Sequence, residues 1–498
     1  MCSNEPDKIW ICANCIKEPF LCAHIVADGM RHTCHYCGNI QSCFTLAVVS
    51  ELTEQALDAH FFRTSEEPSD LEYAMLRHSE HDWCRDGDPI VQVIEELLQT
   101  CPAVAQDIQQ VLEEKHASFD HHDYSGQETE FAADSFYKER RKVSTKRLDS
   151  MWAIFVASLK SESRYINNSV RKTLDGIFSG LDSLQVDGEQ TVITDAGPGT
   201  GVTFLYRSRW SRNQDELEKM MVTPDRELGP PPHRFSGANR MSAKGISVFY
   251  GASSVETTIS EIRPPVGCDV VCAKFSLIRP LRLLNLPALK SVLDSGSMLD
   301  PDFIQKREQA AFLRSLTSRL VTPVLPGDED FSYIPTQVIA EYLADSTQLN
   351  LDGILYPSVQ LAGPVADGSY NVVLFHKASR VRWQRLPTQK DCGINFVCQY
   401  NEDEWEPDLC VTEFVQEGKV PSQPEVEVNE DELLPHFQDH REPALEVDLP
   451  SVSVHHIRAA RFEYSSDSVR RERCHVKSLP VPDQSPWDIG VDPDDTPF

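Results

Sequence analysis

The sequence has little positive charge for its length. Its 47 Lys and Arg residues stand against 77 Asp and Glu residues, which gives a formal net charge of −30. This balance argues against a protein that coats nucleic acid through general electrostatics. The sequence also has no run of 18 apolar residues, and its first residues lack the basic start and apolar stretch of a signal peptide. We therefore expect a cytoplasmic protein with no membrane partner, and we do not expect nucleic acid as its main ligand.

The length and the remaining composition are those of a folded protein with several domains. A chain of 498 residues with 40% hydrophobic and 25% charged residues should form two or three domains. The acidic excess is concentrated, because residues 401–450 hold 16 acidic and 2 basic side chains. This stretch is either a solvated extension or a segment that covers a basic cleft elsewhere in the chain.

Cysteines near the amino terminus have the spacing of a metal site. Cys12-x2-Cys15 and Cys34-x2-Cys37 are separated by 18 residues, and Gly38 follows the second pair. Two such knuckles place four thiolates at the corners of a tetrahedron, so we predict a structural Zn²⁺ in a module at 1–45. The metal would stabilise a segment that is too short for a core of its own. Other residues nearby could replace a ligand, although solvent-facing or core positions are favoured for them: Cys22, His24, His32, His35 and Cys43.

Residues 46–190 have helical periodicity. Apolar residues recur at helical spacing in 90–98 and 152–159, which predicts amphipathic helices that pack into a core. A polar loop is predicted at 119–135. Its residues His121, His122 and Asp123 could bind a metal, but a solvated loop is the favoured interpretation. Arg77 and His81 are similar to the Arg-x4-His signature of helical ribonuclease domains, with one residue too few, and we interpret them as an exposed helix face.

After about residue 190 the periodicity changes from helical to alternating. Strands are predicted at 202–206, 246–250, 270–275, 354–356 and 372–375, and helices at 253–262, 301–320 and 335–344. This order indicates the α+β class, with the zinc-knuckle module and the helical region followed by a mixed α/β domain at 191–380. An acidic extension at 381–476 contains a possible returning strand at Val452–Tyr464, and 477–498 is predicted to be disordered.

The segment 234–265 is the most informative one after the cysteines. A strand that ends at Tyr250 is followed by Gly251-Ala252 and by a helix whose start is marked by Ser253-x-x-Glu256, the pattern of a capping box. This pattern gives Glu256 a structural role. The predicted buried stripe of the helix consists of Val255, Ile259 and Ile262. Glu261 then lies at the flank of the stripe, where a carboxylate can face a cleft.

Several motifs between Tyr206 and Phe375 resemble, in their order and spacing, those of the RES domain family, which is named for an arginine, a glutamate and a serine. The matching elements are Tyr206-Arg207-Ser208-Arg209, Asn239-Arg240-Met241, Tyr250-Gly251-Ala252 with Thr257 and Glu261, Pro335-Thr336-Gln337, Gly353-Ile354-Leu355-Tyr356-Pro357-Ser358, and Asn371-Val372-Val373-Leu374. The residues that flank Arg240-Met241 depart from the family pattern. The helices before this domain, especially 152–181, resemble the HEPN-like amino-terminal domain of some RES proteins more weakly.

The resemblance implies a fold and an activity. Members of the family are NAD⁺-degrading toxins with an ADP-ribosyltransferase-like fold, so the domain would cleave the nicotinamide–ribose bond of NAD⁺. Glu261 would stabilise the oxocarbenium-like ribose. Arg207 and Arg240 would hold the pyrophosphate, because guanidinium groups are bidentate donors to phosphate oxygens. The other implied site residues are Tyr250 against the nicotinamide ring, Ser358 and Asn371 at the cofactor or at Glu261, and Gln337 at the cofactor.

Several alternatives stay open at this point. Each implied site residue has a structural interpretation, and Thr336 or Ser332 could supply the family serine in place of Ser358. NAD⁺ could be split by water (glycohydrolase) or by phosphate (phosphorylase), or its ADP-ribose could be transferred to a macromolecule. An antitoxin or regulatory protein is a possible partner. The rival hypothesis is a partner-binding or nucleic-acid-binding protein with a non-catalytic scaffold, but residues 1–45 hold only Lys8, Lys17 and Arg31 as basic residues.

Overall fold

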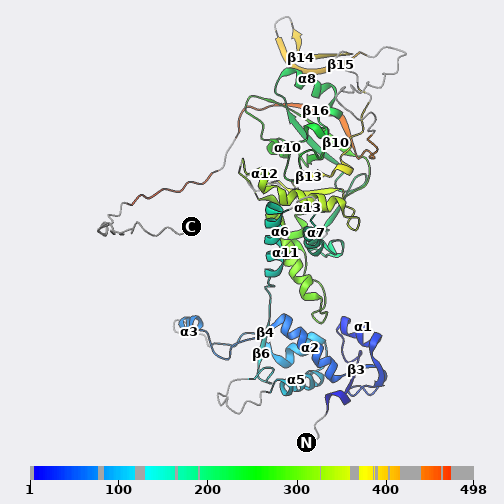
Figure 1. The fold of residues 1–498 in the computed structure, drawn as a ribbon, viewed down its shortest axis with the longest axis vertical. Helices are drawn as coiled ribbons and strands as arrows, with labels where there is room; N and C mark the ends of the chain where they lie inside the picture. The colour runs from blue at the N-terminus through cyan, green and yellow to red at the C-terminus, as the bar shows by residue number, and fades with distance from the viewer. Residues whose placement is uncertain are drawn as a thin grey trace, which may run out of the picture. The chain divides into compact units, whose positions relative to one another are not determined.

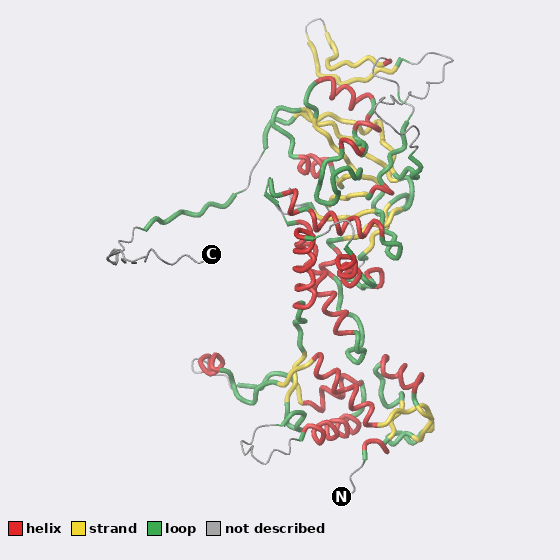
Figure 2. The backbone as a smooth tube through the Cα atoms, in the orientation of Figure 1, coloured by secondary structure: helices red, strands yellow, loops and turns green. Residues whose placement is uncertain are grey.

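The computed structural model describes residues 5–76, 83–117, 129–162, 167–188, 191–322, 324–325, 327–358, 369–384, 386, 391–401, 404–414, 439–460 and 464–472. The chain divides into two units, Met1–Arg458 and Ala459–Phe498. All described helices and strands belong to the first unit (Figures 1 and 2). Predictions for Arg77 and His81, for His121, His122 and Asp123, and for the tail 477–498 lie outside the described residues.

The first residues fold around a three-stranded antiparallel sheet of order β1-β3-β2. Its strands are β1 (Trp10–Cys12), β2 (Met30–Thr33) and β3 (Ile40–Thr45), and helix α1 (Pro19–Asp28) connects β1 to β2. Glu18 caps α1, because its Oε2 accepts a hydrogen bond from the Leu21 amide at 2.8 Å. The apolar side chains of this module share one core with the helices that follow.

The next region is mainly helical, as the periodicity predicts. Its helices are α2 (Leu46–His60), α3 (Asp70–Leu76), α4 (Ile90–Leu98), α5 (Pro102–His116), α6 (Lys146–Ser161) and α7 (Asn168–Phe178). A small sheet of order β4-β6-β5, made of β4 (Phe61–Arg63), β5 (Asp88–Pro89) and β6 (Phe136–Glu139), is not predicted by the sequence. Strands this short have too little alternation to be recognised. Helices α2, α4 and α5 pack with the cysteine module, whereas α6 and α7 pack against the large sheet.

The large sheet has eight strands in the order β16-β10-β8-β9-β13-β12-β11-β7. They are β7 (Ile193–Ala196), β8 (Phe204–Trp210), β9 (Phe249–Ala252), β10 (Asp269–Leu277), β11 (Leu281–Asn285), β12 (Gly353–Pro357), β13 (Tyr370–Leu374) and β16 (Leu445–His456). β11 and β12 are parallel, and the other neighbours are antiparallel. β8 and β9 are joined through one residue pair, Tyr206 opposite Ala252, so the sheet separates into two groups of strands at this point.

Helices cover the sheet and connect its strands. They are α8 (Gln214–Val222), α9 (Pro224–Glu227), α10 (Val255–Ile262), α11 (Phe303–Val321), α12 (Glu329–Ser332) and α13 (Ile334–Asp345), and a separate hairpin consists of β14 (Cys392–Asn401) and β15 (Glu404–Glu413). Figure 1 shows α6, α7, α11 and α13 gathered on one side of the strands. Val373 faces this helical core and Val372 faces the opposite core, because successive side chains of a strand alternate. The α+β fold class that the sequence predicts is confirmed.

Two predictions for α10 are wrong in detail. Its N-cap residue is Ser254, whose Oγ accepts from the Thr257 amide at 3.2 Å, so the capping box Ser253-x-x-Glu256 does not form. Ser253 is still part of the strand pairing, and its Oγ accepts from the Tyr370 amide at 3.0 Å. The buried residues of α10 are Thr257 and Thr258, whereas the predicted stripe Val255, Ile259 and Ile262 is only half-buried. Glu261 follows the two threonines by four and three residues, so it lies on the inward face of the helix.

The returning strand lies earlier than the sequence indicates. Val452–Tyr464 was the expected range, but β16 spans Leu445–His456 and pairs antiparallel with β10 from one end to the other. Leu445 and Val447 are buried in the second core of the sheet. Glu446 and Asp448 occupy outward positions of the strand. Because the segment lies in an acidic stretch, its alternating pattern is difficult to recognise from the sequence.

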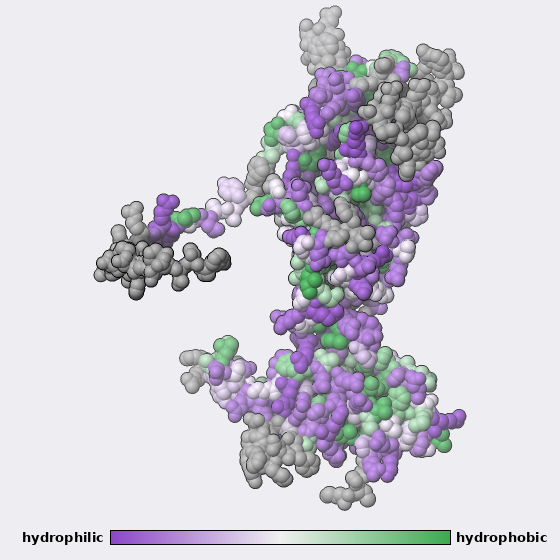
Figure 3. Space-filling model, in the orientation of Figure 1, coloured by the Kyte–Doolittle hydropathy of each residue, from purple (hydrophilic) through white to green (hydrophobic). Residues whose placement is uncertain are grey.

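No helix in the described ranges is both long and apolar enough to cross a membrane. The face of the molecule in Figure 3 is mostly hydrophilic, with apolar residues scattered between polar ones.

We expect removal of β16 to destabilise the large sheet. A chain that ends at residue 385 would expose the edge of β10 and lose the burial of Leu445 and Val447, worth about 3 to 6 kcal/mol together. Its thermal unfolding should occur at a clearly lower Tm or disappear into aggregation. A chain that ends at Arg458 is the matched control and should keep the Tm of the full chain. If both truncated chains melt like the full chain, β16 has no role in stability.

Candidate functional site

The carboxylate of Glu261 lies in a polar cluster formed by α10, β12 and β13. Its Oε1 accepts hydrogen bonds from Asn371 Nδ2 at 2.6 Å and from Ser358 Oγ at 3.0 Å. Asn371 is 2% exposed and Ser358 is 8% exposed, and hydrogen bonds to a charged group contribute about 1.5 to 3 kcal/mol each. Within the described part of the chain, both bonds go to Oε1 and none to Oε2. The second oxygen is therefore available to another group.

The strand register explains why these residues meet. Tyr206, Ala252, Asn371 and Tyr356 lie opposite one another on four neighbouring strands, β8, β9, β13 and β12. Side chains in such a row point to the same face of the sheet. Ser358 follows Tyr356 by two residues and therefore lies on that face as well. The helix α10 starts directly after β9 and brings Glu261 over the row.

Arg207 lies where β8 and β9 separate. Its Nη1 donates to the main-chain oxygen of Tyr250 at 2.9 Å, and its guanidinium carbon is 4.8 Å from the centre of the Phe249 ring. Burial lowers the pKa of Arg207 to about 10, and the neighbouring charge of Arg209 adds to this effect. Arg207 therefore stays positive at neutral pH. No carboxylate pairs with it within the described residues, unlike Arg209, which binds Glu227 Oε2 at 3.2 Å.

Arg240 belongs to a tight turn that is fixed from several sides. Its Nη1 donates to Leu320 O at 3.0 Å and Thr322 O at 2.8 Å, at the carboxyl end of α11. This contact suits a cation, because helix carbonyl ends carry partial negative charge. The main chain of the turn is held from α13, where Thr336 Oγ1 donates to Arg240 O at 2.5 Å and Gln337 Nε2 donates to Asn239 O at 2.8 Å.

Tyr250 connects this turn to the sheet. Its hydroxyl oxygen accepts from the Met241 amide at 3.1 Å. Burial raises the pKa of Tyr250 to about 12, and the nearby charges of Arg240 and Arg207 act in the opposite direction. Tyr250 is therefore close to both arginines, with its hydroxyl bound and its ring half-buried against the helical core.

The structure thus separates the expected site residues into two kinds. Glu261, Ser358 and Asn371 are in direct contact, and Arg207 is in contact with Tyr250. Gln337 instead binds a main-chain oxygen of the turn, and Arg240 binds main-chain oxygens at the end of α11. The hydroxyl of Thr336 also binds the main chain of the turn. Of these two hydroxyls, the one that contacts Glu261 is therefore that of Ser358.

One residue of this region was named in a motif but not expected in the site. Tyr356 lies opposite Asn371 and packs its half-buried ring against the helical core. Burial raises the pKa of Tyr356 well above its ordinary value, and the nearby Tyr250 and Glu261 add to the rise. Its position two residues before Ser358 on a strand is the sequence signal that could have indicated it.

The four cysteines of the two knuckles form a compact cluster. Cys12 Sγ is 3.6 Å from Cys37 Sγ, Cys15 Sγ is 3.8 Å from Cys34 Sγ, and all four sulfur atoms lie within 4.8 Å of one another. Sulfur atoms bound tetrahedrally to one zinc would be about 3.8 Å apart, given a Zn–S distance of about 2.3 Å. The cluster therefore fits a zinc ion.

The second knuckle has the local geometry that such a site needs. Gly38 has φ +73°, a conformation that favours glycine, and its amide donates to Cys34 O at 2.9 Å. A hydrogen bond from the Asn39 amide lowers the pKa of Cys37 to about 7. The other candidate ligands have different contacts: Cys22 Sγ donates to Ile16 O at 2.6 Å, and His32 stacks on Trp10.

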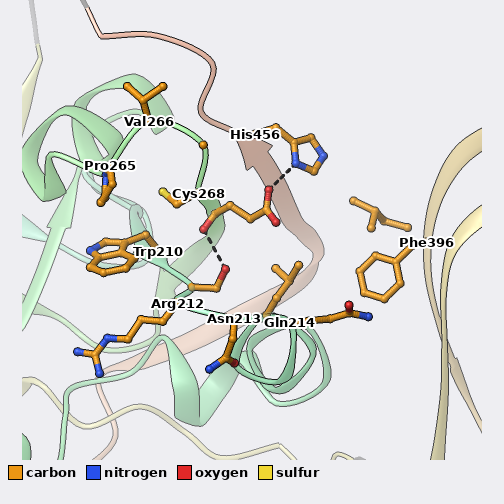
Figure 4. Close-up of a pocket in the computed structure, with 14 residues that line it drawn as sticks. Trp210, Arg212, Asn213, Gln214, Pro265, Val266, Cys268, Phe396 and His456 are labelled. Atoms are coloured by element: carbon orange, nitrogen blue, oxygen red, sulfur yellow. Dashed lines mark hydrogen bonds and ion pairs between the residues drawn. The ribbon is translucent and has the colours of Figure 1, made fainter.

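A pocket of about 680 Å³ lies at the ends of β8, β10 and β16 (Figure 4). Trp210 and Phe396 lie on opposite sides of it, and His456 Nδ1 is 2.5 Å from Asp269 Oδ1 on its wall. None of the expected site residues lines this pocket. The polar cluster around Glu261 is therefore separate from this pocket, and its side-chain chemistry makes it the candidate site.

Comparison with known proteins finds a match to a family model that covers part of the chain. Residues 206–391 match the model of the RES domain. This range contains every residue of the clusters around Glu261, Arg207 and Tyr250. Neither a curated protein nor a solved structure matches the chain. RES domains as a family are associated with NAD⁺-processing enzymes of the toxin type.

We expect the purified chain to carry about one equivalent of zinc, because four thiolates complete a tetrahedral shell. Cys34→Ala should lower the zinc content measured by atomic absorption and reduce the Tm. Cys84→Ala is the control, since Cys84 is exposed and outside the cluster, and it should leave both unchanged. A metal-free chain with a fully folded amino-terminal module would contradict the prediction.

Proposed function

Because residues 206–391 belong to the RES domain family, we propose that this domain cleaves the nicotinamide–ribose bond of NAD⁺ with water or inorganic phosphate as the acceptor. The observation that carries the proposal is the Glu261 carboxylate, which is held through one oxygen by Asn371 and Ser358. A carboxylate oriented in this way is suited to stabilise a cation that develops at a bound sugar. By analogy with the family, the chain would act as a toxin or defence-type effector.

The chemistry requires little from the protein besides charge and orientation. When the bond between ribose C1′ and the pyridinium nitrogen breaks, its electron pair neutralises the positive charge of the leaving group. Nicotinamide therefore departs without a general acid. The ribose becomes oxocarbenium-like, and Glu261 Oε2 would face it. Water then adds to C1′ and releases a proton to give ADP-ribose, whereas phosphate adds to give the 1″-phosphate of ADP-ribose.

Arg207 would bind the pyrophosphate. Its charge is desolvated by the surrounding strands, and a desolvated cation is unfavourable without an anionic partner. Within the described residues no carboxylate supplies that partner. Arg209 does not share this feature, because it is exposed and paired with Glu227. The contrast favours Arg207 over Arg209 as the phosphate ligand.

Tyr250 and Arg240 would complete the site on the side of the turn. The Tyr250 hydroxyl is already bound to the Met241 amide, so its ring is the part available to the nicotinamide. Arg240 contributes charge near Tyr250, and in the structure it also fixes the end of α11. Gln337 supports the same turn through Asn239 O and would act on NAD⁺ mainly through it.

Zinc in the cysteine cluster would have a structural role. A shell of four thiolates leaves no coordination position for a substrate. The metal would therefore stabilise the module at 1–45, which we infer to dock a protein such as an antitoxin or a regulator.

Exchange of Glu261 should affect turnover more than binding. In Glu261→Gln the negative charge is lost while the hydrogen bonds remain possible, so nicotinamide release should fall by about 10²-fold or more with little change in NAD⁺ affinity or Tm. Glu256→Gln is the matched control, because Glu256 is on the same helix but exposed, and it should keep the wild-type rate. Full activity of Glu261→Gln would exclude the catalytic role.

Exchange of Arg207 should affect both binding and turnover. Pyrophosphate is held in the ground state and in the transition state, so Arg207→Ala should weaken NAD⁺ binding by about 10-fold or more and lower kcat/KM at least as much. Arg209→Ala should change neither quantity by more than about 2-fold, because exposed ion pairs contribute little. Isothermal titration and product analysis, with and without phosphate, would measure both effects and identify the acceptor.

The same assay of nicotinamide release tests the rival hypothesis of a partner-binding protein with a non-catalytic scaffold. If the wild type releases no nicotinamide with water or phosphate present, the domain is a scaffold and partner binding becomes the favoured function.

A further inference from the structure

Tyr356 lies beside the cluster formed by Glu261, Asn371 and Ser358. It lies directly opposite Asn371 in the β12–β13 register, and Asn371 Nδ2 donates to Glu261 Oε1 at 2.6 Å. Ser358, the second donor to that oxygen, is two residues further along β12 on the same face. Tyr356 therefore lies beside the two residues that orient the carboxylate.

The hydroxyl of Tyr356 differs from that of its neighbour Tyr250. Tyr250 Oη accepts from the Met241 amide, whereas Tyr356 Oη has no hydrogen-bond partner within the described residues. Tyr356 Oη is not among the fully buried unpaired atoms of the described residues, so it is accessible to water or to a ligand in its place. Its ring is half-buried against the helical core, which restricts the movement of the side chain.

The phenol of Tyr356 acts as a donor over the whole physiological range. Burial holds its pKa well above the ordinary value, and the Glu261 carboxylate adds to this effect. The proton therefore stays on the oxygen. A ribose hydroxyl both donates and accepts, so it can donate to Glu261 Oε2 while it accepts from a phenol beside it.

We propose that Tyr356 Oη donates a hydrogen bond to the ribose of the substrate beside Glu261, which makes Tyr356 a further substrate-binding residue of this site. The inference rests on the proposed function, because it places the nicotinamide ribose at Glu261. It assigns the two tyrosines different tasks: Tyr250 contacts the nicotinamide ring with its face, and Tyr356 contacts the sugar with its hydroxyl.

Tyr356→Phe tests this assignment, because it removes one oxygen and keeps the ring that packs against the core. ADP-ribose contains the ribose and lacks nicotinamide, so its Kd, measured by isothermal titration, should rise by about 3- to 10-fold in the variant. kcat/KM for NAD⁺ should fall by at least the same factor, whereas inhibition by free nicotinamide and the Tm should stay as in the wild type.

Tyr342→Phe is the matched control. Tyr342 Oη donates to Asp175 Oδ1 at 2.8 Å between α13 and α7, so its loss should lower the Tm slightly and leave the ADP-ribose Kd unchanged. An unchanged ADP-ribose Kd in Tyr356→Phe, or a loss of nicotinamide inhibition in its place, would overturn the assignment. Those results are distinct from a failure of the proposed function, which would show as a wild type that releases no nicotinamide.

Discussion

The hydrogen bonds to one oxygen of Glu261 are the interaction on which the candidate site depends. Asn371 and Ser358 come from neighbouring strands, and Glu261 comes from the helix that follows a third strand. The carboxylate therefore joins α10 to the sheet and is also the group proposed to meet the ribose. Because one oxygen is fixed by two donors, the direction of the other is fixed as well. Such preorganisation is the main way in which a protein stabilises developing charge.

The separation of β8 from β9 is the second constraint. A regular ladder would bury the main chain of both strands, but here a single residue pair joins them and the Arg207 guanidinium contacts the main chain of β9. The sheet thus holds the half-buried Arg207 without a carboxylate partner in the described residues. If Arg207 binds the pyrophosphate as proposed, ligand binding would offset the cost of this desolvated charge.

The cysteine module differs from the Arg207 region, because its core and its metal site both favour the folded state. Its apolar residues share a core with α2, α4 and α5, and its four sulfur atoms already lie at distances that suit one metal ion. The metal site and the candidate NAD⁺ site are formed by residues far apart in the sequence, so the loss of zinc and the loss of Glu261 should have separable effects. The loss of zinc should affect folding or docking, and the loss of Glu261 should affect turnover.

The sequence by itself determined those features that depend on local spacing. The two CxxC pairs predict a four-cysteine cluster because a knuckle is a local turn, and the order of alternating and helical segments predicts the fold class. The motifs around Arg207, Glu261 and Ser358 also identify the domain. Local signals failed at the start of α10, because β9 ends at Ala252 and not at Tyr250, and Ser254 and not Ser253 caps the helix.

Only the tertiary structure decided which of these residues meet. The contact of Glu261 with Ser358 and Asn371 spans about a hundred residues of chain and follows from strand register, which no single segment encodes. The same holds for Arg240, whose guanidinium binds the end of α11, and for β16, whose inward residues are recognisable only beside β10. Register and packing are long-range properties, and for this reason Tyr356 became visible as a neighbour of Glu261 only in the folded chain.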